Sequence, residues 1–189
     1  MKKDIILCGV GGQGILSIAT VIGEAATAAG VNLKQAEVHG MSQRGGDVQS
    51  NLRLSTEPIW SDLIPLGQAD LIISMEPMEA LRYTEYINSG SAVVTSSAPF
   101  LNIPNYPDQA AVLAEVDKLP NVVKADIETL ARENSVPKGA NMILLGMAAR
   151  FIGVVSPEEL KAAIGRVFAA KGEAVVQSNI KAFEIGQQI

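Results

Sequence analysis

Residues 5–15 read IILCGVGGQGI, and this stretch decides the fold of the first part of the chain. Its first four residues are apolar without alternation, as in a short strand that is buried on both faces. A glycine-rich turn, Gly9–Gly14, follows at once. From Ile15 to Ala29 the apolar residues recur at helical spacing, and Gly30 stands where a helix commonly ends. The stretch therefore predicts a strand, a tight turn and a helix.

The same alternation continues along the 189 residues. Runs of apolar or β-branched residues predict further strands at 31–39, 48–54, 70–75, 92–95 and 122–125. Helical patterns predict helices at 77–88, from about 108 to 118, at 127–133, at 140–151 and from 157 onwards. We therefore expect one α/β domain over residues 1–189, with an open, mostly parallel doubly wound sheet, helices on both faces and a helical C-terminal part.

Composition excludes several classes of function. Fifteen basic and 20 acidic residues give a net charge of −5, and 4% of the residues are aromatic. An acidic chain with few aromatic side chains is poorly suited to phosphate backbones or stacked bases, so we expect no nucleic-acid partner. The apolar run after the first four residues is too short for a signal peptide or a membrane span, so we expect a cytoplasmic protein with no membrane contact.

Redox cofactors and metals find few ligands in this chain. It has one cysteine, Cys8, whereas a cubane iron–sulfur cluster needs four thiolates. Cys8 stands within the first apolar run, where a free thiol usually behaves as a small hydrophobic residue. His39 is the one histidine. We therefore predict no metal site, no catalytic residue and no redox cofactor held by this chain alone.

The glycine-rich turn has the strand–turn–helix context of a phosphate-binding loop. Glycines allow close approach, and a helix N-terminus offers unpaired amides and partial positive charge to an anion. An NAD site would also need an acid after the second strand. Glu37 is near that place, but HGMSQR follows it instead of an ordinary turn into a helix. Three interpretations stay open: a phosphate-bearing ligand, a purely structural turn, and NAD.

A second polar segment, EVHGMSQRGG at 37–46, should lie beside this loop, because loops at the carboxyl ends of strands gather at one edge. Arg44 is its strongest anion ligand, since guanidinium is always charged and binds phosphate as a fork. His39 could serve as an acid–base group, a ligand contact or a hydrogen-bonded structural residue. The predicted binding residues are Gly9, Gly11, Gly12, Gln13, Gly14 and Arg44.

Three motifs, in order along most of the chain, resemble one family. GVGGQGI at 9–15 is similar to the opening of the gamma subunits or domains of 2-oxoacid:ferredoxin oxidoreductases. EVHGMSQR at 37–44 resembles the form found in the indolepyruvate branch of that family, and MEPMEALRY at 75–83 is similar to the family's EPxEALRY. The resemblance implies a small subunit that supports oxidative decarboxylation of indolepyruvate and other aryl pyruvates.

In that reaction a 2-oxoacid, coenzyme A and oxidised ferredoxin give acyl-CoA, carbon dioxide and reduced ferredoxin. The resemblance implies that a large partner subunit holds thiamine diphosphate and the iron–sulfur clusters and that ferredoxin is met indirectly. Because the chain has one cysteine and no second set of metal ligands, we expect the isolated chain to be colourless and inactive. Coenzyme A would be a possible shared ligand at the glycine turn and Arg44. The rivals are a gamma subunit for pyruvate or 2-oxoglutarate, a free-standing nucleotide-binding reductase, and a scaffold that binds no ligand.

Overall fold

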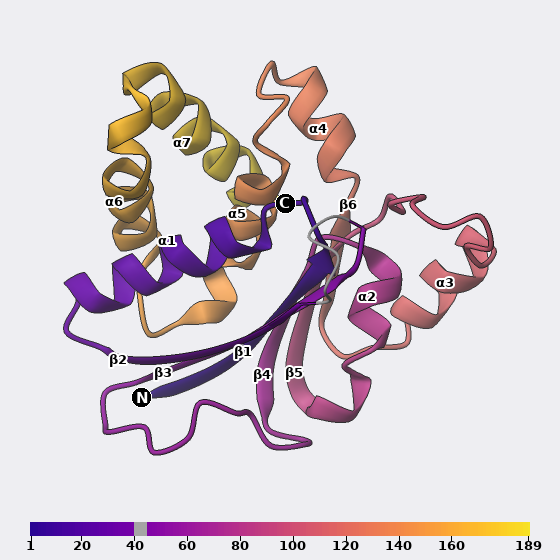
Figure 1. Ribbon diagram of the computed structural model, residues 1–189, viewed down its shortest axis with the longest axis horizontal. Coiled ribbons are helices and arrows are strands. Elements are labelled where there is room, and N and C mark those ends of the chain that lie inside the picture. Colours follow the sequence, from indigo (N-terminus) through magenta and orange to yellow (C-terminus); the bar gives the residue numbers. More distant parts are fainter. Residues whose placement is uncertain (40–44) are drawn as a thin grey trace.

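The computed structural model describes residues 1–39 and 45–189 of the chain (Figure 1). A mixed sheet of six strands forms its centre, in the order β2-β3-β1-β4-β5-β6. The strands are β1 (Lys2–Val10), β2 (Asn32–His39), β3 (Asp47–Ser55), β4 (Ala69–Ser74), β5 (Ile87–Ser96) and β6 (Val122–Ala125). The open α/β sheet expected from the sequence is confirmed.

Strand β3 gives the sheet its mixed character. It runs antiparallel to both β1 and β2, with Ile5 opposite Leu52 on one side and Gln35 opposite the same Leu52 on the other. The pairings β1–β4, β4–β5 and β5–β6 are parallel, so three of the five pairings are parallel. Because β3 lies between them, β1 and β2 are not neighbours although only one helix separates them in the chain.

Helices cover both faces of the sheet (Figure 1). The helices are α1 (Ile15–Ala28), α2 (Pro77–Leu81), α3 (Gln109–Val116), α4 (Ile127–Glu133), α5 (Ala140–Ile152), α6 (Pro157–Phe168) and α7 (Glu173–Gln187), with short 3-10 turns at Thr84–Tyr86 and Ala169–Lys171. Helices α1 and α5 lie against one face, and α6 and α7 pack on them from outside. Helix α2, with α3 beside it, covers part of the other face.

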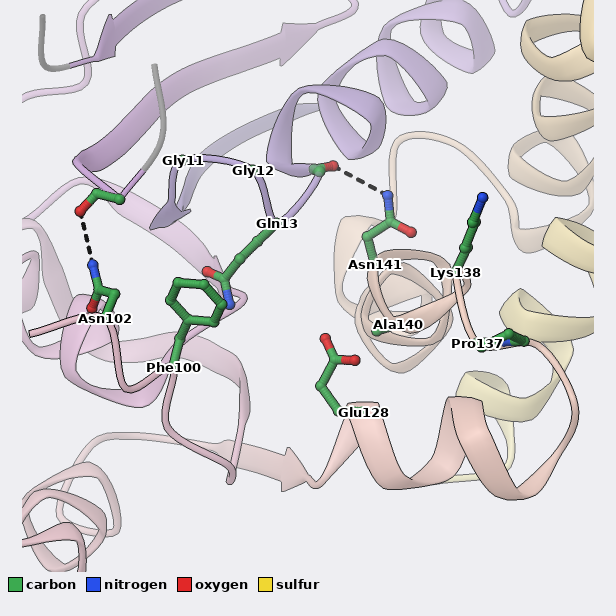
Figure 2. Close-up of a pocket in the computed structure, with 12 residues that line it drawn as sticks. Gly11, Gly12, Gln13, Phe100, Asn102, Glu128, Pro137, Lys138, Ala140 and Asn141 are labelled. Atoms are coloured by element: carbon green, nitrogen blue, oxygen red, sulfur yellow. Dashed lines mark hydrogen bonds between the residues drawn. The ribbon is translucent and has the colours of Figure 1, made fainter. Parts of the chain in front are cut away.

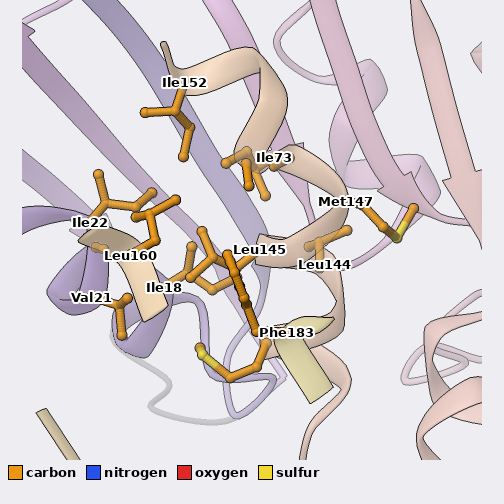
Figure 3. Packing of buried hydrophobic residues seen from close by; sticks show 14 of the residues in the cluster. Ile18, Val21, Ile22, Ile73, Leu144, Leu145, Met147, Ile152, Leu160 and Phe183 are labelled. Atoms are coloured by element: carbon orange, nitrogen blue, oxygen red, sulfur yellow. The ribbon is translucent and has the colours of Figure 1, made fainter. Parts of the chain in front are cut away.

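The main core lies between the sheet and the C-terminal helices. Ile18 and Ile22 of α1, Leu144 of α5 and Phe183 of α7 are all fully buried there, together with Ile73 of β4 (Figure 3). Burying side chains of this size contributes about 1.5–3 kcal/mol each. The helical C-terminal part is therefore one of the walls of the core and packs directly on the sheet.

Two local predictions can be compared with the structure. Helix α6 begins at Pro157, as its sequence predicted, and Ser156 and Glu159 form a capping box at its first turn. The helix expected over 77–88 is wrong in its second half, because α2 ends at Leu81 and β5 already starts at Ile87. Ile87 pairs with β4, and the side chain of Asn88 donates to the carbonyl of Gly67 at 2.9 Å. These long-range contacts override the local helical pattern.

Candidate functional site

Three chain segments meet at the carboxyl ends of β1 and β4. The backbone amide of Gly11, in the glycine turn, donates to the carbonyl of Gly46 at 2.8 Å, and the amide of Gly45 donates back to Gly11 at 3.3 Å. The side-chain amide of Asn102, from the loop after β5, donates to the carbonyl of Gly45 at 2.8 Å. The glycine turn and the end of the 37–46 segment thus share one corner, as predicted. Arg44 lies outside the described residues.

The glycine turn is held from the far end of the chain. Gly14 precedes α1 with φ 88° and ψ 24°, the left-handed conformation that glycine adopts without steric cost. Its carbonyl accepts a hydrogen bond from Nδ2 of Asn141, at the start of α5, at 3.2 Å. A Cβ on Gly14 would lie 2.7 Å from that nitrogen. Residue 14 therefore has to be glycine for two separate reasons, its backbone conformation and the close approach of Asn141.

We expect Gly14→Ala to lower the free energy of unfolding by about 2–3 kcal/mol, combining left-handed strain with loss of the Asn141 hydrogen bond. Gly12→Ala is the matched control, because Gly12 also has a positive φ, 102°, but a Cβ there meets nothing within 4 Å. It should cost about 1–2 kcal/mol from strain alone. Urea unfolding of the purified chains measures both. Equal losses would mean that the Asn141 contact adds nothing.

Two of the predicted binding residues, Gln13 and Gly9, stabilise the glycine turn. Oε1 of Gln13 accepts from the amide of Val10 at 2.7 Å, and Nε2 of Gln13 donates to the carbonyl of Met75 at 3.4 Å. The backbone amide of Gln13 donates to Val10 at 3.1 Å. Gly9 belongs to β1, and a Cβ there would lie 3.0 Å from Oε1 of Gln13. Gln13 and Gly9 therefore stabilise the turn, whereas the turn's surface comes from the glycines at 11, 12 and 14.

A cavity of about 700 Å³ opens beside the turn (Figure 2). The turn forms its upper wall in that view, the loop after β5 closes one side, and the start of α5 closes the other. Its lining residues are Gly11, Gly12, Gln13, Gly14, Gly45, Phe100, Asn102, Glu128, Pro137, Lys138, Ala140 and Asn141. The lining residues from Phe100 to Asn141 lie more than 80 positions after the glycine turn in sequence, and no sequence pattern predicted them.

The electrostatics of this cavity favour an anion. Helices α1 and α5 both begin beside it, after Gly14 and at Ala140, and no side chain of residues 1–39 or 45–189 caps either of them. Two helix N-termini therefore add partial positive charge to the same space. Lys138 is the one cation among the described lining residues.

One acid also lines the cavity. Glu128, in the first turn of α4, has the pKa of its carboxyl raised, first by burial and then by the neighbouring charge of Asp126, while Arg132 opposes the shift. A raised pKa makes this carboxylate less prone to ionise than an ordinary surface glutamate. Glu128 is the one acidic side chain among the described lining residues, opposite in charge to Lys138.

A second, smaller hollow of about 390 Å³ lies on the other side of the turn and shares Gly11, Gly12 and Gly14 with the cavity. Leu16 and Val48 give it apolar walls. His39 and Glu37 also line it, with Nε2 of the histidine 4.0 Å from Oε1 of the glutamate. The glycine turn is thus a thin ridge between two hollows, and His39 belongs to the smaller one.

Cys8 is fully buried, as expected of a small hydrophobic residue. Burial raises the pKa of its thiol to about 12, and the thiol donates to the carbonyl of Glu79 at 3.7 Å. Within residues 1–39 and 45–189, no cluster of three or more His, Cys, Asp or Glu side chains could hold a metal ion. No helix in those ranges combines the length and apolar character needed to cross a bilayer.

The geometry also bears on the NAD interpretation. A dinucleotide site of that kind uses two adjacent parallel strands joined by the first helix, with the acid of the second strand near the turn. Here β3 lies between β1 and β2, so Glu37 stands on a strand that is one position further from the turn. The glycine turn therefore lacks the βαβ unit on which ribose recognition by NAD enzymes depends.

Known proteins are similar to this chain over almost its full length. A family model described as pyruvate ferredoxin/flavodoxin oxidoreductase matches residues 4–189. The chain is 36% identical to the indolepyruvate oxidoreductase subunit IorB of Thermococcus kodakarensis, over 98% of this chain and 95% of that protein. It is 27% identical to the 2-oxoglutarate synthase subunit KorC of Methanocaldococcus jannaschii, over 100% of this chain and 94% of that protein.

Solved structures show the same fold. The gamma subunit of a keto/oxoacid ferredoxin oxidoreductase from Geobacter sulfurreducens aligns with a TM-score of 0.68 and 27% identity, over 98% of this chain and 96% of that one. The 2-oxoglutarate:ferredoxin oxidoreductase of Magnetococcus marinus aligns with a TM-score of 0.78 and 23% identity, over 99% of this chain but 30% of that one. The chain is an open α/β domain with a glycine-lined cavity beside the carboxyl end of its first strand. It belongs to the pyruvate ferredoxin/flavodoxin oxidoreductase family.

Proposed function

We propose that the chain is the small, gamma-type subunit of a 2-oxoacid:ferredoxin oxidoreductase that acts on indolepyruvate and other aryl pyruvates. The observation that carries the substrate class is the full-length likeness to indolepyruvate oxidoreductase subunits at 36% identity, against 27% for a 2-oxoglutarate subunit. The EVHGMSQR form at 37–44 supports the same branch. Pyruvate or 2-oxoglutarate would be the alternative substrate for the same architecture.

The large partner subunit would supply the redox chemistry. One cysteine cannot hold an iron–sulfur cluster, so the residues of this chain do not fit that cofactor. A partner that carries thiamine diphosphate and the clusters would decarboxylate the oxoacid and pass two electrons to ferredoxin. The acyl group would then leave on the thiol of coenzyme A. The role left for this chain is to complete the assembly and to bind and orient coenzyme A.

The cavity beside the glycine turn is our candidate for a phosphate-bearing part of coenzyme A. The two helix N-termini, the glycines at 11, 12 and 14 and the cation Lys138 all favour an anion there. Arg44 is one residue from Gly45, which lines the cavity, and its guanidinium would add a bidentate phosphate ligand. The adjoining smaller hollow, with its apolar walls, would suit a less polar part of the same ligand.

Charge removal at the cavity tests this assignment in the complex reconstituted with the large subunit. Arg44→Ala is expected to weaken coenzyme A binding about 10- to 150-fold, because a charge-assisted pair contributes roughly 1.5–3 kcal/mol. Lys138→Gln should weaken it about two- to fivefold, since Lys138 is exposed and its charge is screened by solvent. Titration calorimetry with coenzyme A measures both affinities.

Lys34→Gln is the matched control, because Lys34 is an exposed lysine near the end of β2 that is remote from the glycine turn. It should leave the affinity for coenzyme A unchanged. If Arg44 only caps a local turn, Arg44→Ala will lower the melting temperature of the chain and leave both assembly and coenzyme A affinity unaltered. Unaltered affinity in both Arg44→Ala and Lys138→Gln would rule out this cavity as the coenzyme A site.

A further inference from the structure

The wall of the cavity formed by Phe100 and Asn102 belongs to a segment without regular structure. Residues 97–108, here called the strap, join β5 to α3 and contain neither helix nor strand. A segment of this kind has no hydrogen-bonded ladder of its own, so its position depends on the contacts that its ends and side chains make. Those contacts therefore decide where this wall of the cavity lies.

Glu76 is the main anchor of the strap. This residue stands between β4 and α2 and is 1% exposed. Its Oε1 accepts from the hydroxyl of Tyr106 at 2.5 Å and from the backbone amide of Phe100 at 3.4 Å (two points six residues apart on the strap). Its Oε2 accepts from the amide of Glu79 at 2.9 Å and so caps α2. One carboxylate thus joins the strap to the sheet edge and to α2.

The chemistry of this carboxylate matches such a role. A buried carboxylate is costly unless it is paired or fully hydrogen-bonded, and within the described residues no lysine or arginine forms an ion pair with Glu76. Hydrogen-bond donors have to stabilise it instead. Burial, with the hydrogen bond to Glu76, raises the pKa of Tyr106, so the phenol keeps its proton and stays a donor.

The strap is in turn hydrogen-bonded to the segment that holds the glycine turn. Asn102, between the two anchored points, donates to Gly45 at 2.8 Å, and Gly45 is hydrogen-bonded to Gly11. Glu76 itself is not among the residues that line the cavity, whereas Phe100, Asn102, Gly45 and Gly11 are. Hydrogen bonds and the short chain segment between Phe100 and Asn102 therefore connect Glu76, a buried acid outside the cavity, to the glycine turn. Figure 2 shows the hydrogen bond that Asn102 makes in this connection.

We propose that Glu76 is a positioning residue for this cavity, holding the strap through Tyr106 and the Phe100 amide so that Phe100 and Asn102 stand against the glycine turn. This inference rests on the proposed function, in which the cavity takes coenzyme A. It also gives a chemical reason for the glutamate of the MEPMEALRY motif, whose second glutamate, Glu79, is paired with Arg82 at 2.7 Å.

Tyr106→Phe tests the proposal in the reconstituted complex, because it removes one hydroxyl from the strap and leaves the helix-capping oxygen of Glu76 in place. We expect the KM for coenzyme A to rise about five- to twentyfold, as a charge-assisted hydrogen bond is lost, with kcat within about twofold. Amide hydrogen exchange should become faster across 97–108. Glu76→Gln, which keeps an acceptor for Tyr106, should show a smaller rise in the same KM.

Tyr86→Phe is the matched control, because it removes a hydroxyl from a tyrosine that packs with Tyr83 beside α2. It should leave both the KM and the exchange of the strap unchanged. Unchanged exchange of 97–108 in both Tyr106→Phe and Glu76→Gln would overturn the anchoring. Faster exchange with an unchanged KM would overturn the role at the cavity.

The wild-type complex tests the proposed function separately. Coenzyme A should slow amide exchange in the glycine turn and in the strap. If it slows neither, the cavity is not the coenzyme A site, and the proposed function fails at this point whatever the variants show. If it slows both while Tyr106→Phe and Glu76→Gln bind coenzyme A like the wild type, the cavity assignment stands and the positioning role of Glu76 is wrong.

Discussion

Gly146→Ala is expected to lower the free energy of unfolding of the chain by about 3 kcal/mol or more, at or beyond the upper end of ordinary overpacking. Gly146 stands on α5 where α7 crosses it, and a Cβ there would overlap the carbonyl oxygen of Phe183. The relation is mutual, because a Cβ on Gly186 of α7 would overlap the carbonyl oxygen of Ile143. Backbone atoms cannot move aside as a flexible side chain can, so α5 and α7 would have to separate.

Separation of these helices would disturb both the packing of the core and the wall of the cavity. Phe183 and Leu144 are fully buried between them and the sheet (Figure 3), and the first turn of α5 carries Asn141 and lines the cavity. Urea unfolding followed by circular dichroism measures the loss.

Gly165→Ala is the matched control for Gly146→Ala, since Gly165 lies inside α6 and a Cβ there meets nothing within 4 Å. Alanine is the better helix former, so this variant should be more stable by about 0.5–1 kcal/mol. The two substitutions are chemically identical and are expected to have opposite signs. A loss below about 1 kcal/mol for Gly146→Ala, within the range of exposed helix positions, would show that α5 and α7 do not approach so closely.

The parts of this fold that could be predicted from sequence are those with a local cause. The apolar run from Ile5, the glycines after it and the helical spacing from Ile15 determine a strand, a turn and a helix without help from distant residues. The capping box at Ser156 is equally local. The place of β3 between β1 and β2 is a matter of strand pairing over long sequence distances, such as Lys2 opposite Ser55, and no periodicity encodes it.

The candidate site also has one part that could be predicted from a local sequence pattern and another that could not. The glycine turn was visible because phosphate-binding loops have a recognisable spacing. Lys138, Asn141 and Glu128 reach the cavity only after α4 and α5 have packed beside the sheet, and each of them reads in the sequence as an ordinary helix-end residue. Glu76 was part of a recognised motif, yet its hydrogen bond to Tyr106 joins residues 30 positions apart. Contacts of this kind follow from the topology of the fold and not from any local sequence pattern.

Arg53→Met is expected to cost about 3–5 kcal/mol of unfolding free energy, the usual effect of breaking a buried ion pair from one side. Asp4 of β1 is fully buried, and Arg53 of β3 binds it as a fork, with Nε 2.8 Å from Oδ1 and Nη2 3.1 Å from Oδ2. The third nitrogen of Arg53 donates to the carbonyls of Ser61 at 3.0 Å and Leu63 at 2.9 Å. The methionine would leave a buried carboxylate without its main partner and would release the loop between β3 and β4.

Lys2→Gln removes the second cation that pairs with Asp4. Comparison with Arg53→Met therefore distinguishes the effect of charge alone from that of the buried bidentate geometry. Nζ of Lys2 lies 2.8 Å from Oδ2 of Asp4, but the lysine side chain is 49% exposed, against 14% for Arg53. An exposed ion pair contributes roughly 0–1 kcal/mol, so Lys2→Gln should lower stability by no more than that. Arg53→Lys should fall between the two variants, because one ammonium cannot reproduce four hydrogen bonds in a planar fork. Equal losses for Lys2→Gln and Arg53→Met would mean that net charge, not burial and bidentate geometry, holds Asp4 in the sheet.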